Sequence, residues 1–200
     1  MPKERAKSPR ARLFIALDLP EAVRDGIVAW GKHELRDPAL RVVPGESLHI
    51  TLVFLGWLPE KQIERLSTIV AGLEARAPSI ELGDPVAKPS PKRARLFALP
   101  ADSSGAVALQ VELERELIAE RLYKPEKRPF WPHVTVARVK FEGRGSKRPR
   151  RLERPPGKLP SRLLRPALGV RVRLYRSELN PTGARYTPLA QIELSEDGRQ

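Results

Sequence analysis

A four-residue pattern, His-x-Thr-x, occurs twice in this 200-residue chain, at residues 49–52 (HITL) and 133–136 (HVTV). Each copy lies in a run of β-branched and other apolar residues, which predicts a strand. Because side chains alternate between the two faces of a strand, the His and Thr of each copy share one face, while the residue between them points into a core. The chain has three histidines in all, so the repeated pattern indicates two similar structural units.

The remaining apolar periodicity predicts strands and helices in a repeated order. A helix is expected to begin at Pro20, because proline loses no hydrogen bond at the first helical position, and to end before residues 37–38. Further helices are expected over residues 60–75 and from about Ser103. Strands are expected at residues 13–17, 48–55, 96–99, 131–139, 170–174 and 189–194. This order predicts an α+β fold whose two halves exchange near residues 78–92.

Local composition indicates the ends of the domain and one internal loop. Residues 1–11 are basic and contain proline, so we expect a flexible arm, then a single domain over residues 12–194 and a tail over residues 195–200. Residues 143–158 (GRGSKRPRRLERPPGK) are rich in arginine, lysine and proline. This composition predicts a solvated, mobile basic loop.

The net charge and composition of the chain limit the classes of partner and site that it can have. There are 37 Lys and Arg against 24 Asp and Glu, a formal net charge of +13. Such an excess favours a polyanion, either nucleic acid or an anionic membrane surface. No apolar run approaches the ~20 residues that span a bilayer, and the absence of cysteine excludes disulfides, Cys-ligated zinc and a thiol nucleophile. We expect a cytoplasmic, monomeric protein with no membrane segment.

Two imidazoles and two hydroxyls in one cleft suit a displacement at phosphorus. Histidine has an unperturbed pKa of ~6.5, so near neutral pH one ring can accept a proton while the other donates one. One His would take a proton from the attacking water and the other would protonate the departing oxygen, while the hydroxyls of Thr51 and Thr135 hold phosphoryl oxygens. This scheme needs no metal and no other cofactor. A zinc site is the rival use of the histidines, but the usual three protein ligands are hard to assemble.

Five segments of the sequence resemble one known family in the same order. They are residues 12–17 (RLFIAL), 48–56 (LHITLVFLG), 128–138 (RPFWPHVTVAR), 174–177 (LYRS) and 183–186 (GARY). In these segments the chain is similar to the two-histidine (2H) phosphoesterase superfamily, and within it to the bacterial and archaeal RNA 2′,3′-cyclic phosphodiesterases, also called the 2′-5′ RNA ligase (LigT-like) family. The resemblance covers about residues 12–194.

The resemblance implies a bilobal fold, in which two pseudo-symmetric lobes of sheet and helix flank a central cleft and each supplies one His-x-Thr strand. It implies hydrolysis of RNA 2′,3′-cyclic phosphate ends, tRNA fragments among them, to leave a 2′-phosphate. It further implies that His49 donates and His133 accepts the proton. The residues by themselves indicate that both histidines act, but not which one is the donor and which the acceptor. Arg138 matches a phosphate-binding arginine of the family. Strict alternation puts Arg138 on the face opposite His133, so a bulge or strand end is needed.

Several alternatives stay open. A 2′-5′ ligase acting on tRNA halves is a second interpretation within the family, and a non-catalytic RNA-binding module would also explain the net charge of +13. Trp131 either stacks on a base or has a structural role. The arginines of residues 171–176 form either a solvated strand face or a phosphate track, and His33 is expected to be a solvated helix histidine.

Overall fold

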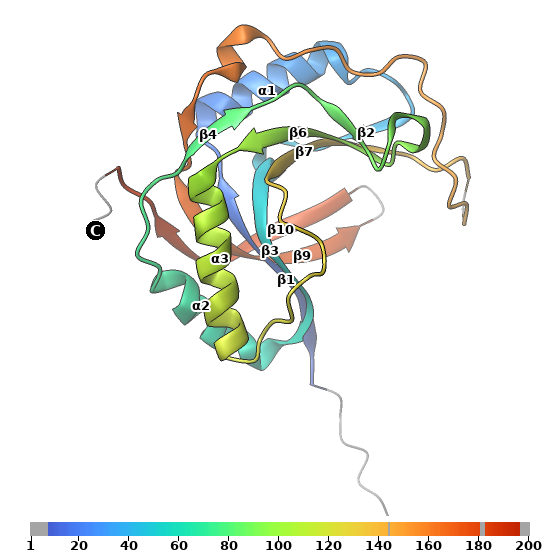
Figure 1. Cartoon of the computed structure of the whole chain (residues 1–200). Coiled ribbons are helices and arrows are strands. Elements are labelled where there is room, and N and C mark those ends of the chain that lie inside the picture. The colour runs from blue at the N-terminus through green and yellow to red at the C-terminus, as the bar shows by residue number, and fades with distance from the viewer. Residues whose placement is uncertain (1–7, 144, 181–182, 197–200) are drawn as a thin grey trace, which may run out of the picture.

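The largest feature of the computed structural model, which describes residues 8–143, 145–180 and 183–196, is an antiparallel sheet (Figure 1). Its strands are β1 (Arg10–Asp18), β2 (Leu40–Val42), β3 (His49–Pro59), β4 (Ser79–Leu82), β5 (Val86–Lys88), β6 (Leu96–Asp102), β7 (His133–Val139), β8 (Ala167–Leu168), β9 (Arg171–Asn180) and β10 (Gly183–Glu193). The helices are α1 (Glu21–Glu34), α2 (Ile63–Ala71) and α3 (Ser104–Ala119), with 3₁₀ turns η1 (Gly45–Ser47), η2 (Glu60–Gln62), η3 (Pro91–Arg93) and η4 (Ser161–Leu164). The predicted α+β class is confirmed.

The two strands that carry the His-x-Thr pattern are neighbours in this sheet. The strand order is β10-β9-β1-β3-β7-β6-β4-β8, with β2 paired to β7 and β5 paired to β6. β3 and β7 pair antiparallel at Ile50 and Val134, the middle residues of the two patterns. Both side chains are fully buried, so the prediction that the residue between His and Thr points into a core is confirmed.

The two halves of the sequence do not stay separate in the sheet. β9 and β10, from the end of the chain, extend the sheet from β1 at its beginning, and β2 from the first half pairs with β7. The helices exchange as well, because α2 and α3 contact β3, β9 and β10, whereas α1 lies over β4, β6 and β7 (Figure 1). An exchange of lobes near residues 78–92 therefore describes only part of the topology, since the closing hairpin returns to cover the open edge of β1.

The helices begin where local sequence signals place them. α1 starts after Pro20, whose carbonyl accepts the first hydrogen bonds of the helix. α3 starts after Ser103, whose Oγ accepts a hydrogen bond from the amide of Ala106 at 3.1 Å. α2 is shorter than predicted, because residues 60–62 form the turn η2 and the helix ends at Ala71.

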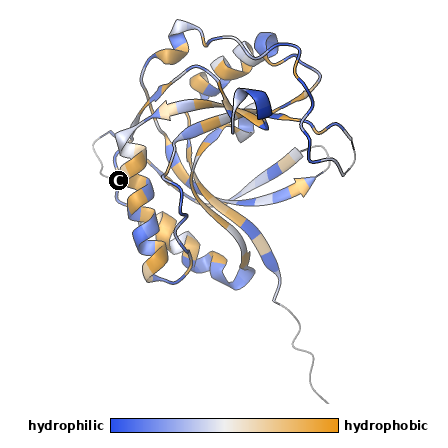
Figure 2. Cartoon of the chain, turned by 45° about the vertical axis from the view of Figure 1, so that its right-hand side comes forward, coloured by the Kyte–Doolittle hydropathy of each residue, from blue (hydrophilic) through white to orange (hydrophobic). Residues whose placement is uncertain are grey.

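The core fills the space between the sheet and the helices, and Figure 2 shows apolar residues along the central strands with more hydrophilic loops around them. Trp30 of α1 belongs to this core, and its Nε1 donates to the carbonyl of Lys158 at 3.0 Å. His33 on the same helix is exposed, as predicted. Within the described part of the chain, no helix combines the length and apolar character needed to cross a bilayer.

Parts of the predicted arm and tail belong to the sheet. β1 begins at Arg10, inside the predicted arm of residues 1–11, and residues 1–7 of that arm lie outside the described residues. Ser195, the first residue of the predicted tail, forms a β-bridge with Arg76, while residues 197–200 are outside the described part. Edge pairing extends the domain by a few residues at each end.

The second part of the basic loop, residues 143–158, is attached to acidic residues at the end of α1. Asp37 Oδ2 accepts a hydrogen bond from the amide of Glu153 at 2.7 Å, and Glu34 Oε2 accepts one from the amide of Gly157 at 2.8 Å. The amide of Gly157 is half-buried, and such an amide requires a partner. Most described residues of the loop are exposed, in agreement with the prediction of a solvated loop, while carboxylates at and just after the end of α1 hold the backbone of its second part.

Candidate active site

The structure brings both His-x-Thr patterns to one cavity. His49, Thr51, His133 and Thr135 all line a cavity of about 110 Å³ at the junction of β3 and β7. In a strand the residues on either side of a buried residue share the opposite face, so pairing of the two strands at their buried middle residues presents all four polar side chains together.

Each of these strands is bulged at the last residue of its pattern. Val136 of β7 has no partner residue on β6, and Leu52 of β3 has none on β1. An additional residue shifts the alternation by one, so the fifth residue after each His returns to the cavity face. That residue is Arg138 on β7 and Phe54 on β3, and both line the cavity. The bulge that strict alternation required for Arg138 is thus present.

The backbone orients both imidazoles in the same way. Nδ1 of His49 donates to the carbonyl of Ser47 at 2.8 Å, and Nδ1 of His133 donates to the carbonyl of Trp131 at 2.7 Å. A carbonyl oxygen only accepts hydrogen bonds, so Nδ1 carries the proton in each ring and Nε2 is the nitrogen available for chemistry. Nε2 of His49 lies 3.1 Å from Oγ1 of Thr51.

His49 lies among aromatic rings. The ring of Phe14 stacks on its imidazole with 5.0 Å between centroids, and Tyr186 meets it edge-on at 5.4 Å. Apolar surroundings disfavour the charged form of an imidazole. Burial, with the nearby charges of His133 and Arg138 as smaller causes, lowers the pKa of His49 to about 4.

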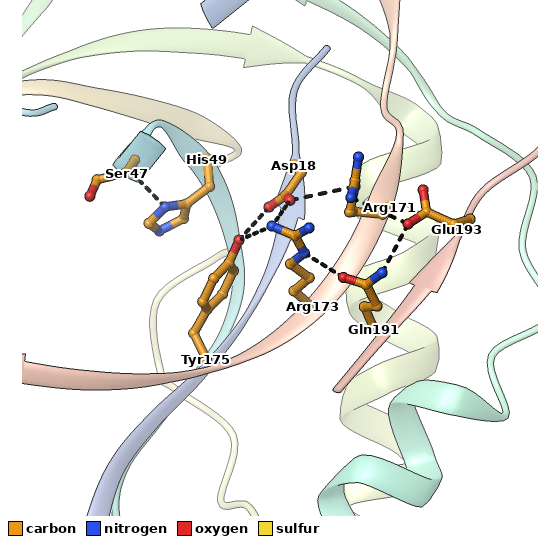
Figure 3. Close-up of polar contacts among 8 residues, drawn as sticks. All are labelled: Asp18, Ser47, His49, Arg171, Arg173, Tyr175, Gln191 and Glu193. Atoms are coloured by element: carbon orange, nitrogen blue, oxygen red, sulfur yellow. Dashed lines mark hydrogen bonds and ion pairs between the residues drawn. The ribbon is translucent and has the colours of Figure 1, made fainter. Parts of the chain in front are cut away.

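A charged network holds the third aromatic ring near His49, that of Tyr175 (Figure 3). The Tyr175 hydroxyl donates to Oδ1 of Asp18 at 2.9 Å. Asp18 is only 6% exposed and pairs with Arg173 at 3.0 Å and with Arg171 at 3.8 Å. The Tyr175 ring lies 6.1 Å from the imidazole of His49. The network therefore positions part of the wall around His49.

The same network decides between the two interpretations of the arginines in residues 171–176. Arg171 and Arg173 pair with Asp18, and Arg176 pairs with Glu60 at 3.1 Å. Burial raises the pKa of Asp18, and its arginine partners oppose that rise. Because carboxylates already engage these guanidinium groups, the structure favours a structural role over a phosphate track.

His133 has different neighbours. The indole of Trp131 stacks on its imidazole with 4.3 Å between centroids and 16° between planes, and Nζ of Lys88 lies 4.2 Å from the centroid of the indole. Burial lowers the pKa of His133 below 6.5, and the charges of Lys88 and Arg138 lower it further. Trp131 therefore packs on a histidine of the cavity, which favours the structural role for this residue.

Besides Val43 and Ser47, four residues to which no sequence pattern assigned a role line the cavity: Arg12, Phe14, Phe54 and Tyr186. The guanidinium of Arg12 lies 4.6 Å from the centroid of the Phe54 ring, and its Nη1 donates to Oγ of Ser177 at 2.7 Å. All four occur within the segments that carry the family resemblance. Spacing within the patterns could not indicate them, since β1 and β10 bring three of them to the site.

The polar groups of the cavity suit an anion that exchanges protons. They include two imidazoles, two threonine hydroxyls and the guanidinium groups of Arg12 and Arg138. Guanidinium and hydroxyl groups donate hydrogen bonds to phosphoryl oxygens, and two imidazoles supply a proton acceptor and a proton donor. Among the described residues, no three His, Asp or Glu side chains gather in a way that could hold a metal ion.

Comparison with known sequences finds a family model described as LigT like phosphoesterase, which matches residues 17–98. Two similar proteins are named RNA 2′,3′-cyclic phosphodiesterase. One, from Thermus thermophilus, is 31% identical over 205 residues, covering 94% of this chain and 93% of the relative. The other, from Methanothermobacter thermautotrophicus, is 30% identical over 189 residues, covering 92% of this chain and 100% of the relative.

Solved structures show the same fold. A protein of known structure from Thermus thermophilus superposes with a TM-score of 0.74 at 30% identity, covering 92% of this chain and 97% of its own. Escherichia coli LigT complexed with 3′-AMP gives a TM-score of 0.69 at 26% identity, covering 93% of this chain and 99% of its own. With more than nine-tenths of the chain covered, the similarity extends over the whole fold and not only over the two motif strands.

Proposed function

Because this chain belongs to the LigT-like phosphoesterase family, we propose that it is an RNA 2′,3′-cyclic phosphodiesterase in which the two cavity histidines perform acid–base catalysis. Hydrolysis of a cyclic phosphate at an RNA end leaves a 2′-phosphate and a free 3′ hydroxyl. One observation carries the proposal: His49 and His133 line the same cavity, and each has Nδ1 bonded to a carbonyl so that Nε2 is available.

The substrate anion is held by donors on both strands. Arg138 lines the cavity, and no ion pair among the described residues joins it to a carboxylate, so its guanidinium is available for the phosphoryl oxygens. The hydroxyls of Thr51 and Thr135 donate to the same oxygens. Arg138 and the two threonines thus orient the phosphorus between the two imidazoles.

Two proton transfers accompany the displacement. Nε2 of His133 takes a proton from water as the water oxygen attacks phosphorus, and the bond from phosphorus to the 3′ oxygen breaks. Nε2 of His49 gives its proton to that 3′ oxygen, as the family resemblance assigns. Burial lowers the pKa of His49 to about 4, and the negative charge of a bound phosphate favours the protonated ring. Substrate binding therefore prepares His49 as the acid.

The proposed reaction is tested with 2′,3′-cyclic AMP in the presence of EDTA, with identification of the product. The expected product is adenosine 2′-monophosphate, formed at the same rate with and without EDTA. Formation of the 3′ isomer contradicts the assignment of the leaving oxygen. Tight RNA binding without turnover favours the non-catalytic alternative, and formation of 2′-5′ junctions from tRNA halves favours the ligase.

We further infer that the protein is a cytoplasmic monomer with one domain, predicted over residues 12–194, which also takes in Arg10 of β1 and Ser195. The substrates are RNA fragments such as those of tRNA. A groove of about 990 Å³ supports a wider RNA contact, since residues 92–95 and 148–151 give it six arginines and lysines while Glu142 is the single carboxylate in its described lining.

A further inference from the structure

A second cavity opens beside the catalytic one. It has a volume of about 330 Å³. The residues that line both cavities are Arg12, Val43, Ser47, Arg138 and Tyr186. The residues that it adds lie on and after β2 and at the tip of the β9–β10 hairpin: Arg41, Val42, Pro44, Leu179, Asn180, Gly183 and Ala184. A molecule bound at the histidines can therefore continue into this second cavity.

The second cavity has an uncompensated positive charge. Arg12, Arg41 and Arg138 line it, and its described lining includes no carboxylate. Arg41 and Arg138 are direct cross-strand partners in the β2–β7 pair. Neither guanidinium forms a hydrogen bond or ion pair with another described residue, whereas Arg173 and Arg176 are paired with Asp18 and Glu60.

Like charges placed directly opposite each other destabilise a pair of strands. A cross-strand arginine pair without a carboxylate therefore destabilises the strand pair, whereas its two positive charges favour the binding of an anion. Guanidinium groups bind phosphate through paired, planar hydrogen bonds. The catalytic cavity already provides Arg138 for the cyclic phosphate, so Arg41 is available for a further anionic group.

We propose that Arg41, with Arg12 lining the same cavity, binds the internucleotide phosphate on the 5′ side of the nucleotide that carries the cyclic phosphate. The inference rests on the proposed function and names its substrate class as oligoribonucleotides. That phosphate is the next anion along an RNA chain from its cyclic end, and a mononucleotide lacks it. Val42 and Leu179, which are 46% and 68% exposed, offer apolar surface to the adjoining nucleoside.

The test compares kcat/KM for three substrates of the intact protein: 2′,3′-cyclic AMP, the dinucleotide ApA with a 2′,3′-cyclic phosphate, and the same dinucleotide with a neutral methylphosphonate linkage. We expect the charged linkage to raise kcat/KM about tenfold over the neutral one, the lower end for a hydrogen bond to a charged group. Arg41→Gln lowers this ratio towards one. The matched control is Arg185→Gln, which removes the same charge from an exposed position on β10 that lines neither cavity.

The outcomes separate this inference from the proposed function. Absence of turnover of 2′,3′-cyclic AMP contradicts the proposed function. Turnover of 2′,3′-cyclic AMP with equal kcat/KM for the charged and neutral dinucleotides overturns the second phosphate site alone. Equal losses of Arg41→Gln on the mononucleotide and the dinucleotide also overturn it, because Arg41 would then act on the cyclic phosphate. The comparison of linkages uses the unaltered protein, so it stands even if Arg41→Gln does not fold.

Discussion

The two His-x-Thr strands share a backbone design and differ in their surroundings. On both β3 and β7, Nδ1 of the histidine bonds to the carbonyl two residues earlier, and a bulge follows the threonine. On β3 the imidazole is enclosed by aromatic rings from β1, β9 and β10. On β7 the imidazole stacks on Trp131, whose ring also contacts the amine of Lys88.

This difference shows that repeated backbone geometry orients the rings, while other strands set their proton affinities. The enclosed ring has the pKa of about 4, and the ring beside Trp131 has a pKa that is lowered from 6.5 by burial and by Lys88. The two strands also differ in how each brings an arginine to the cavity. On β7 the bulge brings Arg138 itself to the cavity, whereas on β3 it brings Phe54, which carries Arg12 on its face.

The largest expected effect tests whether both histidines act in the reaction. Replacing His49 or His133 by Ala should lower kcat/KM for 2′,3′-cyclic AMP by about 10² to 10⁴, the usual contribution of a general acid or base. His33→Ala is the matched control, because His33 is exposed on α1 and lines neither cavity. Nearly full activity in either cavity variant would remove that histidine from the mechanism.

A smaller effect is expected when either arginine of the cavity is replaced, and the two replacements together test how the two strands differ. Arg138→Gln should lower kcat/KM about 10- to 100-fold, since hydrogen bonds to charged groups contribute about 1.5 to 3 kcal/mol. Arg12→Gln should cost less on 2′,3′-cyclic AMP, because Ser177 and Phe54 already engage that guanidinium. A larger loss from Arg12→Gln than from Arg138→Gln contradicts this difference between the strands.

The pH dependence sharpens the comparison of the two imidazoles. Both pKa values are lowered from 6.5 in the free protein, so the form with one protonated and one neutral ring is most populated below pH 6.5. The profile of kcat/KM, which reports the free enzyme, should therefore be bell-shaped with its maximum below pH 6.5. The maximum of kcat should lie at higher pH, because bound phosphate raises both pKa values. A kcat/KM maximum above pH 6.5 is incompatible with burial lowering these pKa values.

The smallest effect is expected outside the cavity, in the basic groove. The double variant Arg93→Gln/Arg151→Gln should weaken binding of a long RNA only a few-fold at moderate salt and reduce the salt slope by about 1 to 2, since each phosphate contact contributes about 0.7 to 0.9. Turnover of 2′,3′-cyclic AMP should not change. Arg65→Gln/Arg115→Gln on α2 and α3 is the control with equal charge, and an equal change of slope in both variants would assign the effect to net charge alone.

Several features of the fold and site followed from local sequence. The strands at the two patterns, the start of α1 directly after Pro20 and the cap of α3 at Ser103 depend on residues close together in the chain. The need for a bulge before Arg138 also followed from alternation. The return of β9 and β10 to β1 did not, because a strand pattern states which face is buried and not which edge it will cover.

The sequence by itself determined the groups available for proton transfer and their common face, because two residues that are two apart on a strand point the same way whatever the strand pairs with. Tertiary structure alone decided that Arg12 lies on Phe54, that Arg41 lies opposite Arg138, and that aromatic rings enclose His49 and not His133. The physical reason is that a pKa and a charge field depend on every group packed nearby. Strand pairing brings those groups together from distant parts of the chain.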